Sequence, residues 1–337
     1  MLALVFAIAL LSLVGCAGGG AGVPPARSTV ASCLGVALMV GASGCKQQTP
    51  PPSNVARTAF CINVARAWTF DPSVDVGFLP ARNAAPDPAE LRAAKFECVR
   101  VDFHHGTASD WIARVRGIGM PVIVITDQPT AADIADPTAY TSILTTGMRR
   151  FPGQSWELIA EADQGDQGYK LSPAQYVTFL KTVIPQLRAA DPTATLISGG
   201  VVGKGGNRPT WLSDISELWP LVDEIGLHCY PPPWLPNPID TLPAILAATK
   251  AQTGKPGIVT EWGLAQQYAP LKPGDPLPNP LTQAQAAADI VQMIHTVDGI
   301  TPRFVVYEWD NRDDQWAATE GFGIVGTPEL AAFTAAR

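Results

Sequence analysis

Ser155-Trp156-Glu157-Leu158-Ile159-Ala160-Glu161 is a short, mainly apolar run that ends on a carboxylate. The chain repeats this pattern in Gly257-Ile258-Val259-Thr260-Glu261, which leads into Trp262-Gly263. Each run has the length and composition of a strand buried on both faces, as in a parallel sheet. In a barrel of parallel strands, the carboxyl ends converge on one mouth. We therefore expect Glu161 and Glu261 to meet there.

Apolar runs alternate with amphipathic stretches from residue 57 onward, which is typical of βα repetition. Helix start signals stand between the runs, among them Ser172-Pro173 and the capping box from Thr282 to Gln285. A doubly wound open sheet is the alternative, but Val64-Ala65-Arg66-Ala67 after the first strand lacks its glycine fingerprint. The sequence thus predicts an α/β fold, a single (β/α)8 TIM barrel over residues 57–337. The eight expected strands are Ala59–Val64, Cys98–Phe103, Val122–Thr126, Trp156–Ala160, Thr195–Ser198, Glu224–His228, Gly257–Thr260 and Phe304–Trp309.

Composition is compatible with one large core. The 337 residues are 47% apolar, and a barrel of about 250 residues would use most of them. The net charge of −7 gives no electrostatic reason to expect nucleic acid as a partner. The 32 prolines and 30 glycines are typical of long, stiff loops.

The first 45 residues have the character of a leader rather than of a folded domain. Two apolar runs end at Cys16 and Cys45, and each is too short to span a bilayer comfortably. Both resemble a bacterial lipoprotein signal. We favour Cys45 as the lipidated residue, because Arg27 precedes its apolar run and the polar, proline-rich stretch 46–56 that follows has the composition of a tether. We expect an exported protein, either a cell-envelope lipoprotein held to the membrane by its lipid or, if the signal is a plain secretory one, a secreted protein.

Cysteine usage after the leader is sparse. The three residues Cys61, Cys98 and Cys229 are an odd number, which excludes a complete disulfide framework. Cys61 and Cys98 fall on the first two expected strands, so a pair between them is one interpretation. We favour the other, in which all three are small core residues.

The two strand-end glutamates have the chemistry of glycoside hydrolysis. A retaining mechanism needs one carboxyl group to protonate the leaving oxygen and another, about 5–5.5 Å away, to attack the anomeric carbon. The nucleophile must stay ionised, which requires a nearby cation or hydrogen-bond donors. Arg100, on the second expected strand, is our candidate for the cation beside Glu261.

Several motifs resemble those of clan A glycoside hydrolases, the group that includes cellulase, mannanase, β-xylosidase and glucanase families. Trp156-Glu157-Leu158-Ile159-Ala160-Glu161-Ala162-Asp163 resembles the Trp-Glu-x-x-Asn-Glu-Pro motif of the clan. His228-Cys229-Tyr230 is similar to its His-x-Tyr, and Thr260-Glu261-Trp262-Gly263 to its nucleophile motif. Arg100 matches the arginine common on the second strand. The order and spacing of these motifs cover roughly residues 57–337.

This resemblance implies a TIM-barrel glycosidase that acts on a poly- or oligosaccharide as a monomer, without cofactor or metal. Glu161 would be the general acid/base and Glu261 the nucleophile. Tyr230 would orient Glu261, and His228 would contact the sugar or the acid. Trp309 would form the aromatic floor of the cleavage subsite, and Trp234 would serve an outer subsite.

Two positions depart from the clan pattern. Ala160 stands where the clan has the asparagine that donates to the sugar 2-hydroxyl, and Ala162 replaces the proline. Another donor such as Gln164 or His104 would then be needed, or the substrate would lack that hydroxyl. The alternative is a non-catalytic, carbohydrate-binding barrel on the cell envelope.

Two other interpretations use the same fold. A metal hydrolase would draw on Asp102, His104, His105 and His228, but adjacent histidines on a strand point to opposite faces. A phosphate-binding barrel would use Gly199-Gly200 and the stretch 203–207, which lacks a P-loop pattern. We expect that glycine-rich segment to be a flexible loop near the cleft.

Overall fold

The computed structural model describes residues 57–64, 85–164, 171–203, 206–230, 238–264, 282–310 and 323–337. The predicted leader and tether, with Cys16 and Cys45, lie outside the described residues, as does Trp234. No helix among the described residues is both long enough and apolar enough to cross a membrane.

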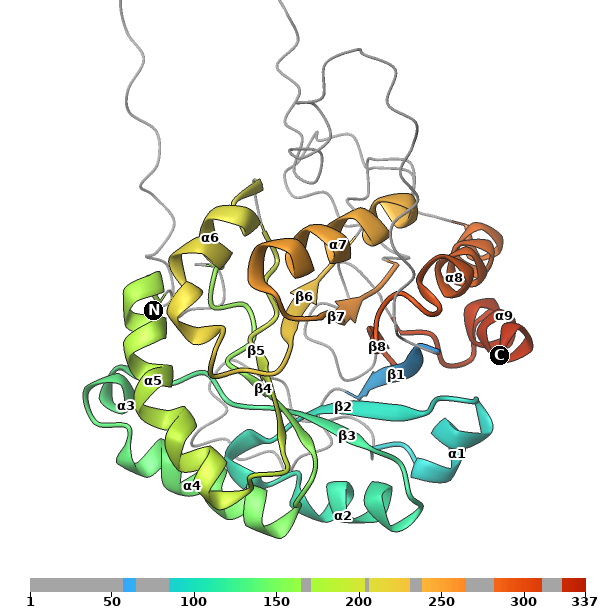
Figure 1. The fold of residues 1–337 in the computed structure, drawn as a ribbon. Helices are drawn as coiled ribbons and strands as arrows, with labels where there is room; N and C mark the ends of the chain where they lie inside the picture. Colours follow the sequence, from blue (N-terminus) through green and yellow to red (C-terminus); the bar gives the residue numbers. More distant parts are fainter. Residues whose placement is uncertain are drawn as a thin grey trace, which may run out of the picture.

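Eight parallel strands form the centre of the fold (Figure 1). Their order in the sheet is β5-β4-β3-β2-β1-β8-β7-β6. Isolated parallel bridges pair Ile197 with Glu224 and Val201 with Leu227, and so join the β5 and β6 edges into a barrel. The strands are β1 Ala59–Val64, β2 Cys98–Asp102, β3 Val122–Ile125, β4 Ser155–Leu158, β5 Thr195–Ser198, β6 Ile225–His228, β7 Gly257–Trp262 and β8 Arg303–Val306.

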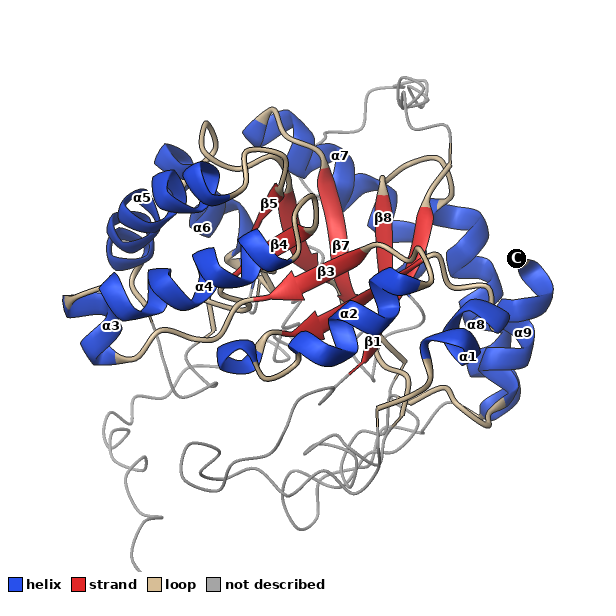
Figure 2. Cartoon of the chain, turned by 90° about the horizontal axis from the view of Figure 1, so that it is seen from below, coloured by secondary structure: helices blue, strands red, loops and turns tan. Residues whose placement is uncertain are grey.

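Helices surround this barrel, as Figure 2 shows from a second direction. The α-helices are α1 Pro88–Ala93, α2 Ser109–Gly117, α3 Ala131–Ala135, α4 Thr138–Arg150, α5 Pro173–Ala190, α6 Arg208–Asp214, α7 Leu242–Thr253, α8 Gln283–Val297 and α9 Pro328–Ala336. Short 3-10 helices are η1 His104–Gly106, η3 Ser216–Leu218 and η4 Pro238–Thr241. The predicted single (β/α)8 TIM barrel is therefore confirmed.

The predicted helix starts are confirmed. Ser172 and Gln175 form a capping box at the start of α5, and Thr282 and Gln285 form another at the start of α8. Each box satisfies backbone N–H groups that have no partner inside the helix. The elements that carry the site are thus fixed by local sequence as well as by packing.

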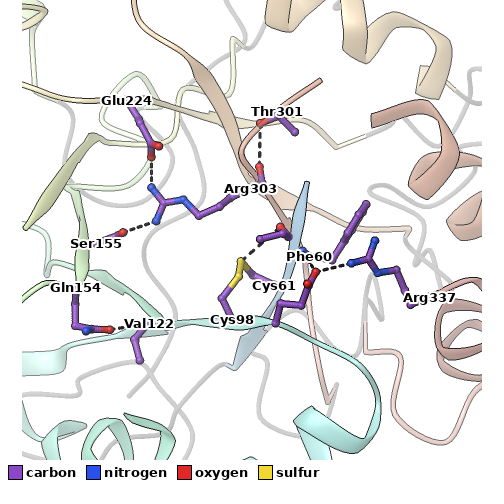
Figure 3. The surroundings of a disulfide bond; sticks show 12 residues. Phe60, Cys61, Cys98, Val122, Gln154, Ser155, Glu224, Thr301, Arg303 and Arg337 are labelled. Atoms are coloured by element: carbon purple, nitrogen blue, oxygen red, sulfur yellow. Dashed lines mark hydrogen bonds and ion pairs between the residues drawn. A yellow bond between two sulfur atoms is a disulfide. The ribbon is translucent and has the colours of Figure 1, made fainter. Parts of the chain in front are cut away.

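An apolar layer of side chains fills the part of the barrel interior next to the amino ends of the strands. Its buried members are Cys61, Cys98, Ile123, Ile197, Ile258 and Val305. On the amino-end side of this layer, Arg303 at the start of β8 donates to Glu224 and to Ser155 (Figure 3). This ion pair closes the amino end of the barrel, while the polar side chains described below lie towards the carboxyl end.

Cys61 and Cys98 form a disulfide inside this layer (Figure 3). They are register partners on the neighbouring parallel strands β1 and β2, which brings their Cα atoms to 4.4 Å. Our preferred interpretation, in which all three cysteines are small core residues, is therefore wrong for this pair. The register of two separate strands determines that Cys61 and Cys98 are neighbours, and the sequence around each cysteine does not show this register. Cys229 is free and buried, as expected of a small core residue.

Two strand ends differ from prediction in ways that matter for the site. β4 ends at Leu158 rather than Ala160, since Ile159 has a left-handed backbone with φ 60°. β8 ends at Val306 rather than Trp309, so its inward and outward alternation does not extend to Trp309.

Candidate active site

The turn after β4 places Glu161 at the mouth of the barrel. Ile159 and Glu161 both adopt positive φ, 60° and 56°. That region is unfavourable for any residue with a Cβ, and especially for a β-branched one. Such strain persists only where the surroundings hold it, and it is concentrated at functional sites.

Three hydroxyl groups hold this turn in place. Thr126, after β3, accepts from the backbone N–H of Ile159 at 2.9 Å, and Tyr140 on α4 donates to Thr126 at 3.0 Å. Tyr176 on α5 donates to the carbonyl of Leu158 at 3.0 Å. Because these residues come from the neighbouring strand and from two helices, the position of Glu161 is set by the fold and not by its own loop.

The glycine pair after β5 lets the backbone approach this turn and the residues behind it. A Cβ on Gly199 would lie 1.8 Å from the carbonyl oxygen of Ile159, and one on Gly200 would lie 2.0 Å from Nε2 of His228. Both positions therefore require glycine for reasons of space. Instead of being a flexible loop, these two residues pack tightly behind the site.

An irregularity in β7 aims Glu261 into the same mouth. The register between β6 and β7 shifts after Leu227, and that between β7 and β8 shifts between Val259 and Trp262. A β-bulge re-aims the side chains beside it. As a result, the successive residues Thr260 and Glu261 both reach the polar network of the mouth.

Glu161 and Glu261 meet around one nitrogen. Nδ1 of His228 lies 2.7 Å from Oε1 of Glu161 and 3.2 Å from Oε2 of Glu261. One carboxylate oxygen of each glutamate and the His228 nitrogen all lie within 4.8 Å of one another. The two carboxyl groups therefore face each other at close range across the His228 ring nitrogen.

Glu261 receives a cation and a hydroxyl donor. Nη1 of Arg100 lies 2.6 Å from its Oε1, and the hydroxyl of Tyr230 donates to its Oε2 at 2.5 Å. Burial and the charge of Glu261 raise the pKa of Tyr230 well above its ordinary value, so Tyr230 remains a donor. Glu261 therefore has a cation on one carboxylate oxygen and a hydroxyl donor on the other.

A third carboxylate, Glu157, lies beneath the pair and is fully buried. Its Oε2 accepts from Nε of Arg100 at 2.6 Å, and its Oε1 accepts from Gly200 N–H at 2.9 Å and the Thr260 hydroxyl at 3.0 Å. Nε2 of His228 lies 3.3 Å from the same Oε1. Burial alone would raise the pKa of Glu157, but Arg100 and His228 hold it at about 2.

His228 is therefore surrounded by carboxylates on both ring nitrogens. Burial disfavours its charged form, but Glu261, Glu157 and Glu161 together raise the pKa of His228 to about 10. At neutral pH the ring carries two protons, and each nitrogen is a donor.

The residues proposed for a metal hydrolase do not come together. His104 and His105, on η1, both face Asp127, with Nδ1 atoms at 3.9 and 3.7 Å from its carboxylate. Burial raises the pKa of Asp102 to about 6, against the opposing charge of Arg100. Within the described ranges, Glu161, His228 and Glu261 are the group with metal-ligand spacing, so the set of Asp102, His104, His105 and His228 is not assembled.

The loop proposed to bind phosphate is already engaged. The backbone N–H groups of Val202 and Gly203 donate to the carboxylate of Asp163 at 3.2 and 2.9 Å. These amides tie the β5 loop to the β4 loop and do not point at an open anion site. Lys204 and Gly205 lie outside the described residues.

The aromatic residue expected at the end of β8 is in a different place. Trp309 is 6% exposed and packs edge-on against Phe96, at 6.4 Å between ring centres, in the core between strands and helices. It does not form the floor of the mouth. Tyr307 is partly exposed, and its ring lies 5.8 Å from that of Tyr230. Tyr307 is thus the aromatic side chain that the end of β8 brings to the site.

Glu157, Thr260 and Tyr307 are site residues that sequence reasoning missed. A signal existed for Glu157, since a charged residue inside an apolar strand must face a polar interior or a partner. The bulge that brings in Thr260 and the early end of β8 left no comparable pattern.

Comparisons with known proteins agree on the fold. The endoglucanase Cel5A of Thermotoga maritima, solved with cellobiose, superposes with a TM-score of 0.57 at 13% identity over 82% of this chain and 97% of that one. A GH128 endo-β-1,3-glucanase of Amycolatopsis mediterranei, solved with laminaritriose, gives 0.53 at 16% over 83% and 100%. A glucosidase of Croceicoccus marinus gives 0.59 at 14% over 83% and 67%. No protein-family model and no curated protein matches the sequence.

Proposed function

We propose that this protein is a retaining glycoside hydrolase that cleaves a poly- or oligosaccharide by double displacement. The observation that carries the proposal is the facing pair Glu161 and Glu261, with oxygens within 4.8 Å. Arg100 and Tyr230 lie on Glu261, which distinguishes the two carboxylates chemically. The shared fold with carbohydrate-active enzymes is consistent with this reaction.

In the first step, an ionised Glu261 oxygen forms a bond to the anomeric carbon while the glycosidic C–O bond breaks. Glu161 gives its proton to the leaving oxygen. In the second step, Glu161 takes a proton from water, the water oxygen bonds to the anomeric carbon, and Glu261 leaves as a carboxylate. Tyr230 and Arg100 stabilise Glu261 in its charged states, before attack and after release.

The comparison proteins support a substrate class for this proposal. Their bound ligands are cellobiose, mannotriose and laminaritriose, which are oligosaccharides of hexoses. We propose a glycan of this kind as the substrate. Purified protein should be screened against aryl glycosides and against cello-, laminari- and manno-oligosaccharides. Release of aglycone or shorter oligosaccharide by wild type, and its absence in Glu261→Ala, is the expected result.

Ala160 favours a second candidate, a barrel that binds glycan without cleaving it. Its side chain lacks the amide that the clan pattern supplies, and its carbonyl accepts from the side chain of Gln128. The substitution Ala160→Asn separates the two candidates. If the protein is a hydrolase limited by this departure, Ala160→Asn should turn over faster than wild type. If neither wild type nor Ala160→Asn cleaves any glycan of the panel, yet both bind glycan measurably, the second function is supported.

We also propose that the protein is exported, with lipid on Cys45. The disulfide between Cys61 and Cys98 supports an oxidising compartment, because cytosolic thiols are normally kept reduced. Mass spectrometry of the mature amino terminus tests this. A lipid-modified Cys45 is expected, and an unprocessed chain contradicts the proposal.

A further inference from the structure

Arg100 and His228 are two buried cations in close contact. Nη2 of Arg100 lies 3.5 Å from Nε2 of His228. Like charges at this distance repel strongly away from water. Glu157 touches both, through Oε2 to Arg100 and Oε1 to His228, so it is the counter-charge that permits them to be neighbours.

Each cation also reaches past Glu157 to the mouth. Arg100 contacts Glu157 with Nε and Glu261 with Nη1, both at 2.6 Å. His228 contacts Glu157 with Nε2, and Glu161 and Glu261 with Nδ1. The charge on Glu157 is therefore coupled to both mouth carboxylates through two shared cations.

We propose that Glu157 is a positioning residue that sets the number of protons in the site, so that Glu161 keeps the proton it must donate. This rests on the proposed glycosidase function. With two cations and three ionised carboxylates the network has one excess negative charge, and burial favours its removal by one proton. Arg100 and Tyr230 both contact Glu261, and Arg100 and His228 both contact Glu157. The extra proton is then on Glu161, which shares Nδ1 of His228 with Glu261.

Removing the charge of Glu157 reverses this balance. With Glu157 uncharged, the two cations Arg100 and His228 are balanced when both Glu161 and Glu261 are ionised. Glu161 would therefore lose its proton at lower pH than in wild type. Other charged or titratable groups that face the network are Asp102 on β2, Asp127 after β3, and Tyr230 and Tyr307 at the mouth. Glu261 also contacts both cations, but it lies at the mouth, whereas Glu157 is fully buried between them.

The test compares Glu157→Gln with Thr260→Val. The first removes the charge, and the second removes a neutral donor to the same oxygen. We expect Glu157→Gln to move the basic limb of the kcat/KM profile to lower pH by about 1 to 3 units, the effect of one nearby charge. Thr260→Val should leave that limb in place. If Glu157 is only structural, both variants lower activity and neither moves the limb.

A second readout does not depend on turnover. Side-chain ¹³C NMR of labelled glutamate, assigned with Glu161→Gln, follows the titration of Glu161 directly. A pKa of Glu161 that falls in Glu157→Gln supports the proposal even if no glycan is cleaved, in which case only the proposed function fails. An unchanged pKa in a folded Glu157→Gln protein overturns it even if wild type is an active glycosidase.

A titration of wild type provides the remaining check, should Glu157→Gln not fold. The chain has 4 histidines, so the ¹⁵N signal of His228 is assigned by its loss in His228→Gln. The proposal expects a ring with two protons throughout neutral pH. A His228 that titrates near an ordinary 6.5 overturns it, because Glu157 would then have one cation to balance instead of two.

Discussion

The hydroxyl of Tyr230 donates to Oε2 of Glu261 across 2.5 Å. A hydrogen bond to the charged form of a carboxylate lowers its pKa and fixes its orientation. In a retaining glycosidase, Glu261 must be ionised and aimed at the anomeric carbon before it attacks. Tyr230 holds the orientation of Glu261, and its hydroxyl oxygen can be removed without changing the ring.

Tyr230→Phe should therefore lower kcat/KM by about 10- to 150-fold, since a hydrogen bond to a charged group contributes about 1.5–3 kcal/mol. Steady-state kinetics measure the loss. Full activity of Tyr230→Phe would show that this bond does not act on the nucleophile.

Gly200→Ala should inactivate the protein and reduce its stability. The new methyl group would overlap Nε2 of His228 at 2.0 Å, and overpacking of this kind costs about 1–3 kcal/mol. Gly117→Ala is the matched control, since a Cβ there meets no atom within 4 Å. Urea unfolding and activity assays of both variants test the pair. Equal behaviour of the two would contradict the close approach at Gly200.

The two aromatic residues that follow β8, Tyr307 and Trp309, should differ in what their removal affects. Trp309→Ala should destabilise the fold by about 3–5 kcal/mol, because its ring is buried in the core. Tyr307→Ala should lower activity with a smaller change in stability, because its ring is partly exposed beside Tyr230. Unfolding and kinetics on each variant separate the roles. A Trp309→Ala protein that is as stable as wild type but no longer binds glycan would contradict this account and show that Trp309 belongs to the site.

Stability should depend on pH through His228. Its pKa is raised from 6.5 to about 10 in the folded state, so its contribution is fully present below pH 6.5 and is lost as the pH rises through 10. Wild type should therefore lose stability across this window more steeply than His228→Asn. Urea midpoints at several pH values measure the difference. Parallel curves would show that His228 is not held in its charged form.

Reduction of the disulfide should destabilise the barrel by about 2–4 kcal/mol, a range typical of such bonds. In residues 57–337, the oxidised protein should show one thiol after unfolding, from Cys229, and the reduced protein three. Thiol titration and urea unfolding with and without reductant measure this. Three thiols without reductant would contradict the pairing of Cys61 with Cys98.

Much of this architecture could be predicted from the sequence because it depends on local patterns. The apolar runs and the capping boxes at Ser172 and Thr282 are local, and they yielded the eight strands and the barrel, although not every strand end. Glu161, Glu261, Arg100, His228 and Tyr230, all predicted site residues, lie together for the same reason: each stands at or near a strand end.

The remainder depends on relations between distant elements. The register of β1 on β2 decides the disulfide, and the bulge in β7 brings Thr260 into the network. Where β8 stops decides whether Tyr307 or Trp309 faces the mouth. None of these relations can be recognised from residues that are neighbours in the sequence. For this reason we expected Trp309 in the cleavage subsite, whereas it lies in the core between strands and helices.

The stereochemistry of azide rescue tests the central claim most directly. Glu261→Ala should be inactive, and added azide should restore cleavage of an activated aryl glycoside with an inverted glycosyl azide as product. Glu161→Ala should retain its first step on a dinitrophenyl glycoside and give a retained glycosyl azide, because that leaving group departs without a proton. The anomeric configuration of each product is read by ¹H NMR. Turnover by Glu261→Ala without azide, or a wild-type product of inverted configuration, would contradict the assignment of Glu261 as the nucleophile.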